Sequence, residues 1–133
     1  MDKKQKSDIE SIQDIQFLVN LFYARVREDD LLSPIFESVI GEKWDDHFER
    51  MYRFWETVLL GKYTYKGSPF PPHLNLPVEG KHFSRWLELF KSTVNSFFAG
   101  EKAEKAKMQA SNMAEMFEAK ISFYRNQGFE PLA

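Results

Sequence analysis

The sequence predicts an all-α fold, and two observations support this prediction. Apolar residues recur every three or four positions along most of the chain, while no segment shows the sustained apolar–polar alternation of a half-buried strand. Gly and Pro stand between the periodic segments, where they end helices. The 133 residues suffice for one core and contain neither a repeat nor a low-complexity tract. We therefore expect one domain over residues 1–133, with 1–11 and 126–133 at its periphery.

The first helix is expected to begin at a capping box formed by Ser7 and Glu10, whose spacing lets both side chains bond backbone groups in the first turn. Its apolar stripe consists of Ile15, Leu18, Phe22 and Val26. The acidic run at 28–30 is an unfavourable end for this helix but a good cap for a short helix over 31–36. Pro34 is tolerated in the first turn of that short helix, and Gly41 follows it.

A long helix is predicted over residues 44–60, because a wide apolar face repeats there with helical spacing and Gly61 can end it. Several Gly and Pro residues make 63–72 mainly loop. The following segment 73–76 has room for at most about one helical turn before Pro77.

Two further helices are predicted over 82–98 and 101–127, with Gly100 between them. The first has an apolar face made of Phe83, Trp86, Leu87, Phe90, Val94 and Phe97. The second aligns Ala106, Ala110, Met113, Phe117, Ile121 and Tyr124, and Gly128 and Pro131 stop it.

Composition excludes several classes of protein. The net charge of −2 provides no broad basic field for nucleic acid or an anionic membrane, and the lack of cysteine excludes disulfides, zinc–thiolate sites, iron–sulfur clusters and thiol catalysis. No apolar stretch follows Met1, so we expect neither a signal peptide nor a membrane span, and a cytoplasmic location by default.

Aromatic residues make up 16% of the chain, and 13 residues are Phe. Flat rings suit a pocket for a large planar ligand, although an aromatic-rich core is the commoner explanation.

The three histidines are the candidate site residues, since no nucleophile, phosphate-loop or zinc-protease motif is present. His73 lies between prolines in a stiff short turn, which suits an axial haem ligand, although a surface loop histidine is the commoner case. His47 is either a half-buried helix-edge residue or a polar group above a pocket. Glu79 and His82 have the E-x-x-H spacing of di-iron bundles, but those need a second copy, so we expect His82 at the surface near a pocket rim.

Short motifs follow one another in a characteristic order along nearly the whole chain, from about Ile12 to Tyr124. They are Leu-Phe-Tyr at 21–23, Ser-Pro-Ile-Phe at 33–36, Trp-Asp-Asp-His-Phe at 44–48, Arg-Phe-Trp-Glu at 53–56, Tyr-Lys-Gly at 65–67, Pro-Pro-His-Leu at 71–74 and His-Phe-Ser-Arg-Trp-Leu at 82–87. In this order they resemble the truncated haemoglobins, specifically the third group. That group lacks the glycine pairs of the other two, and this chain has six isolated glycines. It also carries histidine where this chain has His47.

The resemblance implies a truncated globin-like two-over-two helical sandwich that encloses haem b, with His73 as the proximal iron ligand. Tyr23, His47 and Trp86 would form the distal side, although simple core packing is the alternative for Tyr23 and Trp86. The remaining haem contacts are expected from Phe36, Met51, Phe54, Tyr65, Lys81, His82, Arg85 and Phe90. Tyr65, Lys81, His82 and Arg85 are the candidates for the propionates, and a charged helix start is the alternative for the last three.

The resemblance further implies binding of O2, NO or CO at ferrous iron, because donors aimed at iron-bound dioxygen favour its superoxide-like charge. Oxidation of NO to nitrate and cleavage of peroxide are chemically available, and either needs a separate reductase, since no flavin or nicotinamide motif is present. The alternatives are a gas carrier, store or sensor without turnover, and a haem-free globin-like interaction module. We expect neither nucleic acid nor a membrane as a partner.

Overall fold

The structure of the chain, a computed structural model, describes residues 6–64 and 80–126, with side chains described as far as residue 123. These residues form five α-helices and no strand, which confirms the all-α prediction. The helices are α1 (Ile12–Glu28), α2 (Ser33–Ile40), α3 (Trp44–Leu60), α5 (Gly80–Phe97) and α6 (Glu101–Asn126). None of them is long and apolar enough to cross a membrane.

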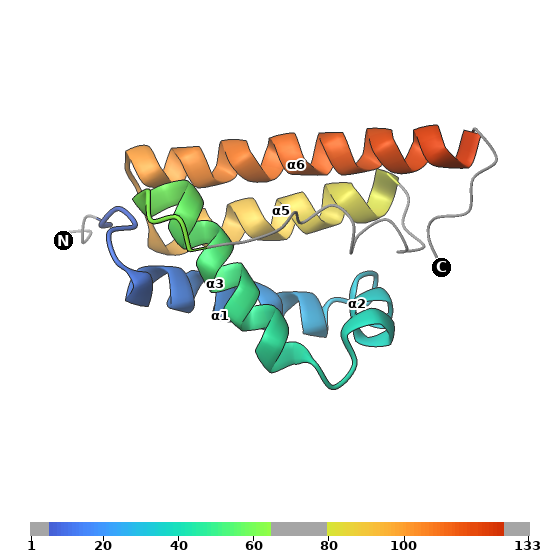
Figure 1. Cartoon of the computed structure of the whole chain (residues 1–133), viewed down its shortest axis with the longest axis horizontal. Helices are drawn as coiled ribbons and strands as arrows, with labels where there is room; N and C mark the ends of the chain where they lie inside the picture. The colour runs from blue at the N-terminus through green and yellow to red at the C-terminus, as the bar shows by residue number, and fades with distance from the viewer. Residues whose placement is uncertain (1–5, 65–79, 127–133) are drawn as a thin grey trace.

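The four longer helices of the described residues form two pairs. The helices α5 and α6 lie side by side and run in opposite directions, while α3 crosses α1 at an angle (Figure 1). Contacts of α1 with α5, and of α3 with α6, join the two pairs. This is the two-over-two arrangement that the sequence predicts, and it places the middle of α1 between α3 and α5.

The core is built from the predicted apolar stripes. Ile15, Leu18, Phe22 and Val26 of α1 are all buried, and Phe90 and Val94 of α5 meet them from the other pair. The inner face of α6 is built from small residues, among them the buried Ala103, Ala106 and Ala110. Small side chains at a helix contact allow a short distance between the helix axes. The α5–α6 pair therefore packs closely along its length.

The predicted capping box at Ser7 and Glu10 is wrong, because α1 begins four residues later. Ser11 is the N-cap, and its Oγ accepts a hydrogen bond of 3.2 Å from the backbone N–H of Asp14. The Asp14 carboxylate in turn accepts from the N–H of Glu10 at 2.9 Å. A related pair of cap bonds therefore exists four positions later, although the Asp14 carboxylate reaches the residue before the N-cap and not the N-cap itself.

The segment before α1 is used elsewhere, which explains the shift. The Asp8 carboxylate accepts hydrogen bonds from the N–H groups of Lys102 and Ala103, at 2.9 and 2.8 Å, and so caps the distant helix α6. Gly100 has a φ of 138°, and a Cβ at this position would lie 2.5 Å from Asp8 Cγ. Glycine is therefore required at the turn into α6.

Most other predicted boundaries agree with the structure. The helix over 44–60 is confirmed, as is its end at Gly61, which has a φ of 71°. The short helix α2 starts later and runs further than predicted, because the Asp29 carboxylate caps the N–H groups of Leu31 and Leu32 in the preceding turn. Most of the predicted loop at 63–72, the turn at 73–76, Pro77, Gly128 and Pro131 lie outside the described residues.

Candidate functional site

Tyr23 of α1 and His47 of α3 lie in direct ring contact. Their ring centroids are 4.8 Å apart and the ring planes meet at 86°. Tyr23 is 5% exposed, and the Nε2 atom of His47 is buried although the residue as a whole is half-buried. Two of the three predicted distal side chains therefore come together where α1 and α3 cross.

Trp86, the third predicted distal residue, lies one aromatic side chain away from this pair. Its ring centroid is 5.6 Å from that of Phe22, and the Phe22 ring is 4.8 Å from Tyr23. The Trp86 ring also stacks on Phe90 at 5.9 Å, and Phe90 stacks on Trp55 at 5.1 Å. A continuous set of aromatic rings thus connects Trp86 with Tyr23 through the core.

The apolar residues predicted to form the haem walls lie on α2, α3 and α5, and Phe36 among them is in ring contact with Tyr23. Phe36 is buried with its ring 6.2 Å from Tyr23, and Phe54 is buried with its ring 5.1 Å from Trp55. Met51 is half-buried against the core. Phe90 is only 1% exposed, so its observed role is core packing, and a contact with haem stays a prediction.

At the start of α5, Arg85 binds acidic side chains. Its Nε donates to Asp29 Oδ1 at 2.7 Å, and its Nη1 donates to Glu88 Oε1 at 2.8 Å. Burial by itself would raise the pKa of Asp29, but the bonds from Arg85 and from two backbone N–H groups outweigh it and hold that pKa below its ordinary value. Arg85 therefore ties α5 to the turn between α1 and α2, and Lys81 beside it is exposed.

The prediction that His82 lies at the surface is wrong, because His82 is 9% exposed. It stands four residues before Trp86 and eight before Phe90, so helical spacing places it on the inward face of α5. The other two predicted contacts, Tyr65 and the proximal ligand His73, lie outside the described residues. Their roles stay predictions.

A tyrosine phenol is neutral at physiological pH, and burial keeps Tyr23 neutral at more alkaline pH as well. Removal from water raises the pKa of its phenol above the ordinary value, because the charged phenolate loses hydration. As a neutral hydroxyl, Tyr23 can donate one hydrogen bond into an apolar space.

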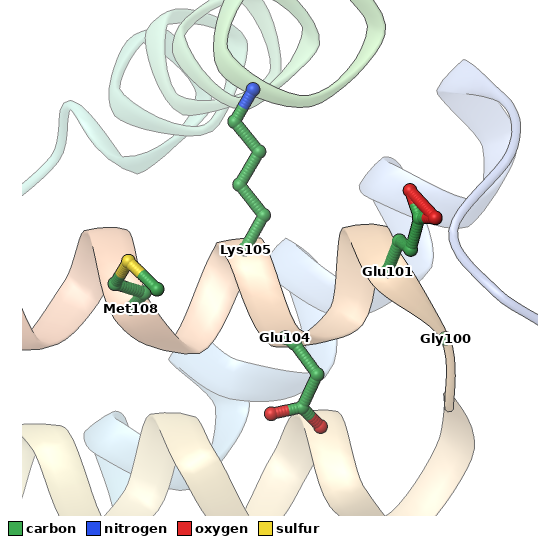
Figure 2. A pocket seen from close by; sticks show the side chains of 5 residues that line it. All are labelled: Gly100, Glu101, Glu104, Lys105 and Met108. Atoms are coloured by element: carbon green, nitrogen blue, oxygen red, sulfur yellow. The ribbon is translucent and has the colours of Figure 1, made fainter.

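Two surface hollows in the described part of the chain lie elsewhere, along α6. The larger, of about 500 Å³, is lined by Gly100, Glu101, Glu104, Lys105 and Met108. Figure 2 shows Glu104 pointing toward α5 while Lys105 points toward α3. The smaller, of about 300 Å³, shares Glu104 and Met108 with it. Neither hollow includes a predicted site residue, and their charged rims do not suit a large apolar ligand.

Metal-ligating side chains do not gather in the parts of the chain described here. Within residues 6–64 and 80–126, no group of three or more His, Asp or Glu side chains is placed to hold a metal ion. The histidine-based site therefore has no rival multi-ligand metal centre among these residues.

Trp44 is not among the predicted site residues, yet it belongs to the candidate site. Its ring lies 5.7 Å from His47 and 5.8 Å from Tyr23, and the residue is 6% exposed. Trp44 precedes His47 by three residues, a spacing that places two helical side chains on one face. That spacing is the signal that could have identified it.

Comparisons with known proteins agree with this fold. The family model described as "Bacterial-like globin" matches residues 8–121. The group 3 truncated hemoglobin ctb of Campylobacter jejuni is 36% identical over 112 residues, which cover 78% of this chain and 88% of that protein. A crystal structure of group III truncated hemoglobin from Campylobacter jejuni matches with a TM-score of 0.79 and 31% identity, over 88% of this chain and 95% of the other.

Proposed function

The chain belongs to the bacterial-like globin family, and within it to the group III truncated haemoglobins, so on that premise we propose which of its residues bind haem and a diatomic gas. Membership of the globin family implies haem and, through haem, the binding of diatomic gases. The residue assignments are our proposal: Tyr23, His47 and Trp86 face the gas, and His73 holds the iron from the other side.

The contact between Tyr23 and His47 is the observation that supports the distal assignment. A haem pocket needs flat apolar walls and a few polar groups near the iron. The rings of Phe36, Trp44 and Phe48 all lie within 6.2 Å of Tyr23, centroid to centroid. The phenol hydroxyl of Tyr23 and the imidazole of His47 supply polar groups at this crossing. This donor set fits haem.

When bound, haem supplies a ferrous iron that reversibly coordinates a diatomic gas. Tyr23 is a neutral phenol at physiological pH, and its raised pKa makes the phenolate still less accessible, so it offers an O–H to the gas rather than a charge. His47 lies in the first turn of α3 and is half-buried, which lets its imidazole serve as a second donor or as a gate. The indole N–H of Trp86 would supply a third donor from α5.

The propionates would lie near the start of α5, close to Tyr65, Lys81, His82 and Arg85. Arg85 already uses two of its nitrogens for Asp29 and Glu88, so it offers the remaining guanidinium nitrogen. Two finer roles stay predictions: oxidation of NO and cleavage of peroxide, each with an external reductase. The haem type, haem b, and a cytoplasmic location also stay predictions.

An optical spectrum tests the haem assignment. The full chain reconstituted with haem should show an intense Soret band. His73→Gly should lose the native band position, and added imidazole should restore it by occupying the vacated ligand site. An unaltered spectrum in this variant would reject His73 as the ligand, and a wild-type chain that takes up no haem would reject the proposed function as a whole.

A further inference from the structure

Outside the predicted site, three side chains from three helices form a closed contact, the Glu37 cluster: Arg27 of α1, Glu37 of α2 and Trp44 of α3. The Trp44 indole Nε1 donates to Glu37 Oε1 at 3.0 Å, and Arg27 Nε donates to Glu37 Oε2 at 2.9 Å. The Arg27 guanidinium carbon also lies 4.4 Å from the centroid of the Trp44 ring. The Glu37 carboxylate thus binds both Arg27 and Trp44, and Arg27 and Trp44 also contact each other.

The inner side of the same indole touches both distal residues. The Trp44 ring meets His47 at 89° and Tyr23 at 60°, with centroid distances of 5.7 and 5.8 Å. Since His47 and Tyr23 also contact each other, the three rings are mutually in contact. Trp44 therefore connects the Glu37 cluster with the predicted gas-facing pair.

The first turn of α3, which contains both Trp44 and His47, is not held by a capping side chain. Lys43 is the N-cap residue and makes no side-chain cap hydrogen bond. Gly41, just before it, adopts a φ of 56°, in the region that favours glycine. The bond from the Trp44 indole to Glu37 therefore links this turn to α2 in place of a cap.

The Glu37 carboxylate is suited to accept both hydrogen bonds continuously at neutral pH. The hydrogen bond from Trp44, and next to it the bond from Arg27, lower the pKa of Glu37 below its ordinary value. A glutamate is charged at neutral pH, the lowered pKa keeps Glu37 charged further into acid, and the carboxylate accepts from both donors at once.

We propose that Trp44 is a positioning residue for His47: Glu37 and Arg27 hold the indole, and the indole holds the imidazole against Tyr23. The indole N–H is committed to Glu37, so Trp44 does not itself donate to a gas. The positioning role rests on the proposed function, because it matters for gas binding only if His47 and Tyr23 face the bound gas. Loosening the cluster should let His47 leave Tyr23 and open the path to the iron.

The experiment uses the haem-loaded full chain. Glu37→Ala removes both bonds, Glu37→Gln keeps an acceptor for the indole but removes the charge, and Trp44→Phe keeps a ring but removes the N–H. CO association after flash photolysis should speed up by about threefold in Glu37→Ala, within the range for mutations along a coupled network. The control is Glu49→Ala, which removes an exposed ion pair with Arg53 on the same helix and should leave the rate unchanged.

A double mutant separates positioning from a general loss of structure. If Glu37 acts through His47, then Glu37→Ala should have no further effect on the CO rate in a His47→Leu background. An equal effect in both backgrounds would overturn the proposal. So would an unchanged CO rate in both Glu37→Ala and Trp44→Phe. Should Trp44→Phe fail to fold, Glu37→Ala decides, because it removes both bonds and, with Glu37 near the surface, creates no cavity.

Proton NMR supplies a readout that does not depend on gas binding. Contacts between the His47 and Tyr23 rings should be seen in the wild type and in Glu49→Ala, and should weaken in Glu37→Ala. The same measurement on the haem-free chain distinguishes the two proposals. Loss of haem binding with intact ring contacts would reject only the proposed function, whereas unchanged contacts in Glu37→Ala would reject the positioning role of Trp44.

Discussion

The corner where α1, α2 and α3 meet differs in construction from the side of the molecule formed by α5 and α6, where α5 packs against α1 as well as against α6. The corner is held by edge-to-face rings and by the Glu37 cluster, whose Arg27 and Glu37 side chains are 43% and 39% exposed. The α5–α6 side rests instead on fully buried apolar residues such as Phe90, Val94 and Ala110. Close apolar packing resists movement, while polar contacts near water can break and reform. We infer that the α5–α6 side resists movement more than the corner, where we propose that the gas-facing residues lie.

The largest expected effect is on the packed side. Phe90→Ala should lower the free energy of unfolding by about 4 kcal/mol, because it removes a large ring and leaves a cavity between Trp55 and Trp86. Phe97, 42% exposed on the same helix, provides the control, and Phe97→Ala should cost less than about 1 kcal/mol. Urea titration followed by far-UV circular dichroism measures both. Equal losses would mean that the α5 core is not where stability resides.

The second-largest expected loss of stability is at the turn into α6. Gly100→Ala should destabilise by about 2 kcal/mol, because the residue has a φ of 138° and its new Cβ would overlap the Asp8 carboxylate. Gly61→Ala is the matched control, since Gly61 also has a positive φ but no atom lies within 4 Å of the position that its Cβ would take, and it should cost about 1 kcal/mol. Thermal unfolding compares the two, and a smaller loss at Gly100 would contradict the capping role of Asp8.

Asp29 links the corner to α5 through Arg85, and its lowered pKa makes the stability of the folded chain depend on pH. Its pKa is lowered in the folded chain, so its contribution to stability is present above the ordinary carboxyl pKa and is lost as pH falls through the folded-state value. Asp29→Asn should cost about 1.5 kcal/mol at pH 7, and the cost should shrink in acid. Urea unfolding midpoints of the wild type and of Asp29→Asn between pH 7 and pH 3 measure this cost. A cost that is independent of pH would show that the charge of Asp29 does not matter.

The smallest expected effect on stability is at the corner itself. Arg27→Gln should lower the free energy of unfolding by less than about 1 kcal/mol, because its ion pair with Glu37 is largely exposed and screened by water. The same variant should nevertheless speed CO association in the haem-loaded chain, since the indole of Trp44 loses one of its supports. A large loss of stability, or an unaltered CO rate, would remove the distinction between the two regions.

Local signals in the sequence predicted much of the fold. The apolar periodicity and the flanking glycine defined α3 to the residue, since both depend on neighbours along the chain. The capping box failed for the opposite reason. Ser7 and Glu10 have the right spacing, but Asp8 between them bonds to Lys102, a partner that no local pattern reveals.

The candidate site was predicted in part. Tyr23 and His47 were identified from the family motifs, and the structure brings them together. Trp44 and the burial of His82 were missed, although helical spacing from His47 and from Trp86 contains that information. The Arg27–Glu37 contact was not predictable, because it depends on how α2 turns back toward α1, which tertiary packing decides.

Dissociation of O2 from the ferrous haem-loaded chain tests the central claim most directly. Tyr23→Phe should speed it by about tenfold, the factor that loss of a hydrogen bond of about 1.4 kcal/mol implies, while Tyr63→Phe, at a residue 89% exposed, should leave it unchanged. If Tyr23→Phe releases O2 at the wild-type rate, then Tyr23 does not donate to the gas, and the distal side at the crossing of α1 and α3 is wrongly assigned.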